Sequence, residues 1–207
     1  MKVFVYGTLL TNFHNWRLYV QPMLSTGQAQ LISEAITEAR FPMIVTAERN
    51  VPAIYNCDAG NHIRGEVYDM SENCVQALDI IEGTKDGFYT RLPLMAKSLS
   101  TGEVLECDSY FKGSGEKIDL EGSDKEMEEM RQLAKWMERK KPFLSEYTKD
   151  LHESYYVLDF KPEVLSRAAQ KSIKEVKAAY DSIEPQLKGK TEREKTEILA
   201  TVWEKLL

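Results

Sequence analysis

Two carboxylates, Asp79 and Glu82, lie three residues apart near the end of a stretch in which apolar residues recur at helical spacing. Residues at i and i+3 of a helix share one face, so both side chains should point the same way at the helix end. A carboxyl group held in such a position can accept and release a proton, as general acid/base catalysis requires. The alternative is a solvated acidic face, which is common on surface helices.

A second candidate site stands at the start of the chain. The run from Val3 to Tyr6 is β-branched or aromatic and predicts a buried strand, which Gly7 then ends. Because glycine has no Cβ, the amides of Gly7, Thr8 and Leu9 could point into a cavity and hold an anionic group. The plain alternative is a first strand followed by a hairpin turn.

The three cysteines, Cys57, Cys74 and Cys107, are scattered and form no CxxC pair, and the three histidines form no HxxxH or HExxH pair. We therefore expect no metal site. Cys74 falls in the first turn of a predicted helix, where the helix dipole could lower the pKa of its thiol. A Cys–His hydrolase thus stays open as an alternative function.

The composition of the 207 residues is that of a soluble globular protein, with 43% hydrophobic and 29% charged residues. The net charge of −6 disfavours nucleic acid and anionic membranes as partners. The first ten residues do not resemble a signal peptide, and nowhere do 18 apolar residues follow one another. We therefore expect a cytoplasmic protein.

The first half of the chain has the patterns of an antiparallel sheet or small barrel. A capped amphipathic helix is predicted over residues 71–82, with Ser71 as N-cap and Gly83 as the stop. Residues 12–24 suit a short helix or wrapped loop ended by Pro22. Strands are predicted at residues 28–36, 41–45 (strand or loop), 62–68, 91–96 and 104–111.

The second half of the chain is predicted to be helical. Glycines from Gly113 onward indicate a linker, and capping boxes begin at Ser123 and Thr191. A second helix is expected from Leu144 to Tyr155, and each helix has one apolar stripe that must be buried. The chain is therefore divided into a barrel domain, 1–115, and a helical extension, 116–207, which could pack on the barrel or form a homodimer.

Five segments, taken together and in this order, carry a resemblance to a known family. They resemble the gamma-glutamylcyclotransferase-like (AIG2-like) family: Val5-Tyr6-Gly7-Thr8-Leu9, Arg64-Gly65-Glu66-Val67-Tyr68, Leu78-Asp79-Ile80-Ile81-Glu82-Gly83, Phe88-Tyr89-Thr90-Arg91 and Ser109-Tyr110. The resemblance covers roughly residues 1–112, about the length of one small domain. It implies an α+β fold, a small mixed β-barrel with short helices, here followed by an α-helical C-terminal extension.

The resemblance also implies a reaction and the residues that serve it. In this family the α-amino group of a γ-glutamyl amide attacks the γ-carbonyl and releases 5-oxoproline and an amine or amino acid. The substrate carries its own nucleophile, so no cofactor is expected. Glu82 is implied as the catalytic acid/base. Substrate binding is implied for Tyr6, Gly7, Thr8, Leu9 and Tyr110, and supporting roles for Asp79, Tyr89 and Arg91.

Three questions stay open at this stage. Tyr89 and Arg91 could equally be structural residues that pack and hydrogen-bond around the loop after the helix. The same fold could also serve as a non-catalytic γ-glutamyl-binding or protein-interaction module. Residues 116–207 could shape the choice of leaving amine, or they could simply stabilise the barrel or a dimer.

Overall fold

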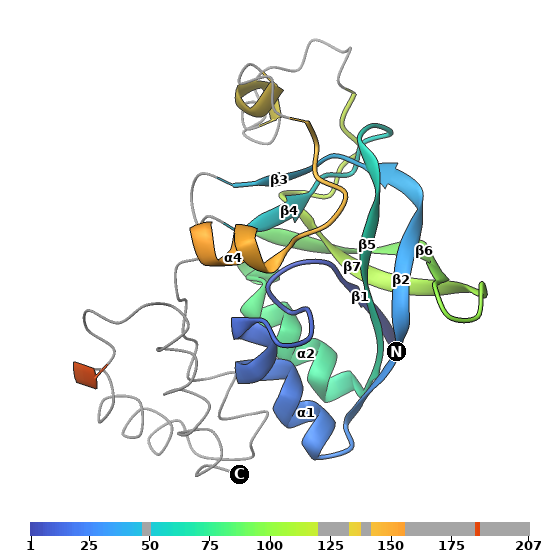
Figure 1. Ribbon diagram of the computed structural model, residues 1–207, viewed down its shortest axis with the longest axis vertical. Helices are drawn as coiled ribbons and strands as arrows, with labels where there is room; N and C mark the ends of the chain where they lie inside the picture. The colour runs from blue at the N-terminus through green and yellow to red at the C-terminus, as the bar shows by residue number, and fades with distance from the viewer. Residues whose placement is uncertain (47–50, 120–132, 138–141, 156–184, 187–207) are drawn as a thin grey trace.

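The computed structural model describes residues 1–46, 51–119, 133–137, 142–155 and 185–186. Seven strands form one sheet in the order β1-β5-β2-β6-β7-β4-β3 (Figure 1). The strands are β1 (Lys2–Val5), β2 (Ala29–Phe41), β3 (Met43–Val45), β4 (Pro52–Ile54), β5 (Asn61–Met70), β6 (Tyr89–Ser98) and β7 (Val104–Lys112).

The sheet closes on itself because β1 also pairs with β7. The pairing of β1 with β7 is parallel, with Val3 opposite Asp108, whereas β1–β5, β5–β2, β2–β6 and β6–β7 are antiparallel. Five strands thus form a closed mixed barrel, and closure leaves these strands no free edge along the ring. The predicted fold class is confirmed for the barrel and its short helices.

The alternation of residue types in β5 places side chains as the sequence predicts, with one exception. Ile63, Gly65 and Val67 are buried, as expected of the core face. Tyr68 alternates with these residues and would therefore lie on the opposite, polar face of the strand, but it is fully buried. It packs in the cluster that joins the barrel to the helices, so this end of β5 is covered on both faces.

The helix α2 (Glu72–Ile81) has the predicted caps. The Ser71 side chain accepts a hydrogen bond from the N–H of Cys74, and Gly83 ends the helix in a left-handed conformation with φ 65°. Pro22, in contrast, does not end a helix. After a π-helical turn, Trp16–Val20, it lies in the first turn of α1 (Gln21–Ser25), where a missing N–H costs nothing.

Two large hydrophobic clusters make up most of the core, beside a small third one of Phe13, Val45 and Tyr147. One lies inside the barrel and draws buried side chains from β1, β2, β5, β6 and β7, including Phe4, Ile63 and Phe111. The other joins the outer side of β1 to α1 and α2 and contains Val3, Tyr19, Tyr68, Leu78 and Tyr110. Both helices therefore cover one side of the barrel (Figure 1).

The chain after the barrel returns to pack on it. Residues 142–148 contain no helix and precede α4 (Lys149–Tyr155), so the predicted helix from Leu144 is wrong at its start. Leu144 instead forms an antiparallel bridge with Met43 at the edge of β3. Residues 133–137 are helical, as predicted. The capping boxes predicted at Ser123 and Thr191 lie outside the described residues, and the domain boundary near residue 115 stays a prediction.

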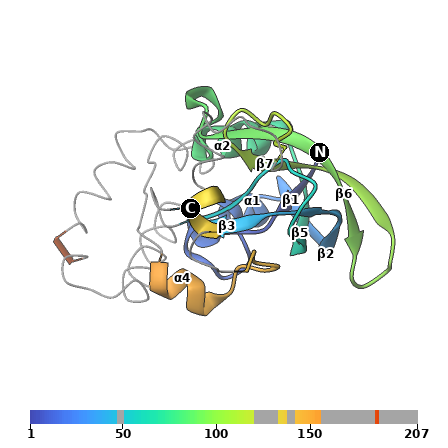
Figure 2. The same ribbon diagram turned by 90° about the horizontal axis from the view of Figure 1, so that it is seen from above.

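Seen from above, α2 and α4 lie on opposite sides of α1 (Figure 2). In the described part of the chain, no helix is both long and apolar enough to span a bilayer.

Candidate functional site

The loop that follows β1 is held close to β4. A Cβ built on Gly7 would lie 2.6 Å from Cγ of Pro52, far inside van der Waals contact. The carbonyl of Pro52 in turn accepts a hydrogen bond from the Tyr89 hydroxyl at 3.2 Å. Any residue larger than glycine would therefore push Pro52 and the loop apart, which is the reason for glycine at this position.

The loop is folded on itself but leaves amides available. Leu10 N donates to the carbonyl of Gly7 at 3.0 Å, and Asn15 Nδ2 donates to Oγ1 of Thr8 at 3.0 Å. Among the hydrogen bonds of the described residues, none has the backbone N–H of Gly7, Thr8 or Leu9 as its donor. Consecutive amides of this kind can bind an anionic group such as a carboxylate.

A second set of hydrogen bonds anchors the same loop to β5. Both the N–H and the hydroxyl of Thr11 donate to Oε2 of Glu66 at 2.9 Å, and the Tyr68 hydroxyl donates to the same oxygen at 2.7 Å. Trp16 Nε1 donates to the Tyr68 hydroxyl at 3.0 Å. Sequence reasoning missed this anchor. The feature of the sequence that could have indicated it is the pair Glu66 and Tyr68, which lie on one face of an alternating strand.

Tyr6 is a buried tie between strands. Its hydroxyl donates to the carbonyl of Tyr110 at 2.7 Å and accepts from the N–H of Ile54 at 3.3 Å. Burial raises the pKa of the Tyr6 hydroxyl far above its ordinary value, and the negative charge of Glu82 raises that pKa further. Tyr6 is therefore neutral and fixed in orientation.

Asp79 is the centre of an ion-pair and hydrogen-bond network. Its Oδ1 accepts from Arg91 Nε at 3.0 Å and from the Tyr110 hydroxyl at 2.9 Å. Arg91 also donates to Oδ2 of Asp108 at 2.6 Å. Asp79 and Arg91 thus hold the Tyr110 ring in one orientation, and their supporting roles in a reaction stay a prediction.

Glu82 lies one turn further along α2, at its C-terminal cap. Its residue is half-buried, and its N–H donates to the carbonyl of Leu78 at 2.8 Å. The pKa of the Tyr110 hydroxyl is raised by burial, by Asp79 and, to a smaller extent, by the negative charge of Glu82. The charge of Glu82 thus raises the pKa of two buried hydroxyls, those of Tyr6 and Tyr110.

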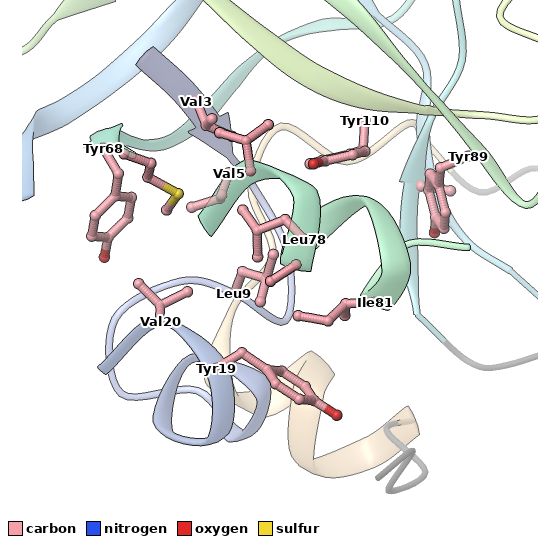
Figure 3. Close-up of a cluster of buried hydrophobic side chains, with 14 of the residues drawn as sticks. Val3, Val5, Leu9, Tyr19, Val20, Tyr68, Leu78, Ile81, Tyr89 and Tyr110 are labelled. Atoms are coloured by element: carbon pink, nitrogen blue, oxygen red, sulfur yellow. The ribbon is translucent and has the colours of Figure 1, made fainter. Parts of the chain in front are cut away.

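The loop and the helix end meet through apolar contacts. The Leu9 side chain lies beside Leu78 and Ile81 of α2, and Tyr110 and Tyr89 lie on the barrel side of this helix (Figure 3). The structure therefore brings predicted residues from the segment after β1, from α2, from β6 and from β7 to one end of α2.

Cys74 and Cys107 do not have the environment of a catalytic thiol. Burial raises the pKa of Cys74, despite its place in the first turn of α2, and raises that of Cys107 to about 11. A thiol nucleophile needs the opposite shift, which argues against these two cysteines as the nucleophile of a Cys–His hydrolase. In the residues that the structure describes, no group of three or more His, Cys, Asp or Glu side chains is placed to hold a metal ion.

The chain is similar to known proteins in sequence. The family model for "Gamma-glutamyl cyclotransferase, AIG2-like" matches residues 3–138. The chain belongs to this family. A Drosophila melanogaster protein, whose name marks it provisionally as a gamma-glutamylcyclotransferase, is 38% identical over 113 residues, which are 53% of this chain and 68% of that protein. A Bos taurus gamma-glutamylaminecyclotransferase is 33% identical over 109 residues, which are 52% of this chain and 63% of that protein.

The fold has solved relatives as well. The crystal structure of a mouse AIG2-like protein superposes with a TM-score of 0.57 at 21% identity and covers 77% of this chain and 96% of that one. This likeness shows the shared fold. Together, the family and the named relatives indicate an activity of the gamma-glutamylcyclotransferase type.

Proposed function

We propose that the protein cyclises γ-glutamyl amides to 5-oxoproline. The α-amino nitrogen attacks the γ-carbonyl carbon, the C–N bond of the five-membered ring forms, and the γ-amide C–N bond breaks. Two protons leave the α-nitrogen, one before the attack and one as the ring closes, and both end on the departing amine. No electrons are exchanged, and the nucleophile is part of the substrate.

The observation that supports this proposal most is the position of Glu82 at the end of α2. Its negative charge there raises the pKa of the buried hydroxyls of Tyr6 and Tyr110. A single carboxylate there can accept the proton of the α-ammonium and return it to the leaving amine. Asp79 is a poor candidate for this step because Oδ1 already accepts from Arg91 and Tyr110. Glu82 is therefore the proposed catalytic residue.

The loop after β1 is the proposed binding site for the α-amino acid end of the substrate. The amides of Gly7, Thr8 and Leu9 are suited to its α-carboxylate. The carboxylate would then be held beside the end of α2, because Leu9 packs against Leu78 and Ile81 there. This arrangement would bring the α-nitrogen toward Glu82.

For the leaving group, we propose γ-glutamyl amines as the first substrate class to test. The support is that several relatives, among them the cattle protein at 33% identity, carry the name gamma-glutamylaminecyclotransferase. Free γ-glutamyl amino acids and glutathione are the competing classes.

The test is release of 5-oxoproline from γ-glutamyl amines, γ-glutamyl amino acids and glutathione, measured for the parent and for Glu82→Gln. General acid/base catalysis is worth ~10²–10⁴-fold, so Glu82→Gln should lose kcat by that factor while it keeps binding. Glu72→Gln, which changes an exposed carboxylate at the other end of the same helix, is the matched control and should keep the parental kcat. Substrates that bind in calorimetry but release nothing would instead identify a non-catalytic binding module.

A further inference from the structure

Residues 142–152, here called the strap, follow the part of the chain that matches the family and lie against the barrel. They run first along the edge of β3 and past β5. Three hydrogen bonds tie them there: Leu144 N to the Met43 carbonyl (2.9 Å), Arg64 N to the Ser145 carbonyl (2.8 Å) and Asn61 Nδ2 to the Phe143 carbonyl (2.6 Å).

The end of the strap packs on the loop after β1 through aromatic rings. The ring of Phe13 lies 5.7 Å from that of Tyr147 and 5.0 Å from that of His152, centroid to centroid, and the latter pair is T-shaped. Tyr147 and His152 also face each other edge-on at 5.9 Å, with 3.4 Å between the Tyr147 hydroxyl and His152 Nδ1. All three side chains are buried, so the contact between strap and loop is dry.

Phe13 belongs to the same hydrogen-bonded unit as the amides proposed to bind substrate. Its N–H donates to the carbonyl of Leu10 at 2.9 Å, and the N–H of Leu10 donates to the carbonyl of Gly7 at 3.0 Å. On the other side of the loop, Thr11 is anchored to Glu66. The loop is thus held from two directions, by β5 and by the strap.

We propose that the strap is a positioning element for the binding loop. Contact of Phe13 with Tyr147 and His152 keeps residues 7–13 in the conformation that binds the α-amino acid end of the substrate, so the strap sets substrate affinity and takes no part in proton transfer. Tyr147 and His152 are positioning residues on this account. The identity of the ligand rests on the proposed function, whereas the contact itself can be tested without a substrate.

The experiment uses the full-length chain with Tyr147→Ala and His152→Ala combined. Amide hydrogen exchange, followed by mass spectrometry, should accelerate about tenfold in peptides that cover residues 7–17, the change that ~1.4 kcal/mol of lost packing produces. Peptides from β2 and β5 should exchange as in the parent. Leu99→Ala, which removes a side chain 49% exposed in the turn between β6 and β7, is the control and should change neither region.

Kinetics supply a second readout. The double variant should raise KM about tenfold and leave kcat at the parental value, since Glu82 lies on α2 and not on the loop. Parental exchange over residues 7–17 in a variant whose strap exchanges faster would overturn the proposal, as would a loss confined to kcat. If β2 and β5 also lose protection, Tyr147→Leu, which keeps most of the volume, decides by the same criterion.

Failure of the proposed function can be distinguished from failure of the strap proposal, because the two are measured by different assays. A parent that releases no 5-oxoproline from any γ-glutamyl substrate would refute that function, and the exchange of residues 7–17 would still decide whether the strap holds the loop.

Discussion

Removal of the Asp79 carboxylate should cost much more stability than removal of an exposed one. In Asp79→Ala the Tyr110 hydroxyl, on a residue only 3% exposed, loses its acceptor. An unsatisfied buried hydroxyl costs ~1–3 kcal/mol. The ion pair with Arg91 adds at most ~1 kcal/mol, since both side chains are about a quarter exposed (29% and 25%) and partly screened by solvent.

Arg91 also keeps a second partner, Asp108, at 2.6 Å, which limits its share of the loss. The expected destabilisation is therefore ~1–4 kcal/mol, a large part of the ~5–15 kcal/mol by which a domain is stable. Asp79→Asn retains an oxygen acceptor for Tyr110 and should lose only ~1 kcal/mol. Glu103→Ala, an exposed carboxylate in the turn between β6 and β7, should stay within ~0.5 kcal/mol of the parent.

A double-mutant cycle isolates the contact between Asp79 and Tyr110. Tyr110→Phe removes the hydroxyl, so Asp79→Ala in that background should lose only the Arg91 share, and the coupling free energy should be ~1–2 kcal/mol. Urea unfolding followed by circular dichroism measures all four proteins. A coupling free energy within ~0.5 kcal/mol of zero would refute the reasoning, because the hydroxyl would then have found another acceptor.

Two further perturbations test other parts of the molecule. Burial lowers the pKa of His152 to about 4, below its ordinary value of 6.5, so the unfolded chain binds the extra proton between these values. Stability should therefore fall by up to ~2 kcal/mol as the pH drops from 7 to 5, and urea unfolding of His152→Gln should show a flatter pH dependence. Gly7→Ala places a Cβ 2.6 Å from Pro52 Cγ and should raise KM and lower stability by ~1–3 kcal/mol. A parental KM would mean that the Pro52 ring moves aside and leaves the loop amides in place.

Local patterns predicted much of the barrel and of α2, because their signals are short-range. Ser71 and Gly83 mark the helix ends through their own hydrogen bond and backbone conformation, and alternation in β5 follows from the pleat. The parts that failed depend on contacts distant in sequence. Leu144 has helical spacing to its neighbours, yet it pairs with Met43, about a hundred positions away, which no local pattern can indicate.

In the candidate site, too, local spacing predicts one part, and contacts distant in sequence decide the rest. Spacing predicts that Asp79 and Glu82 share a helix face, and it treats them as equivalent. Their partners separate them: Asp79 meets Arg91 and Tyr110 across β6 and β7, which engages its carboxylate in structure. Glu82 lies one turn later, where its negative charge raises the pKa of the Tyr6 and Tyr110 hydroxyls. We therefore propose different roles for these two chemically similar carboxylates, and this assignment needs the closed barrel that brings β1, β6 and β7 to the end of α2.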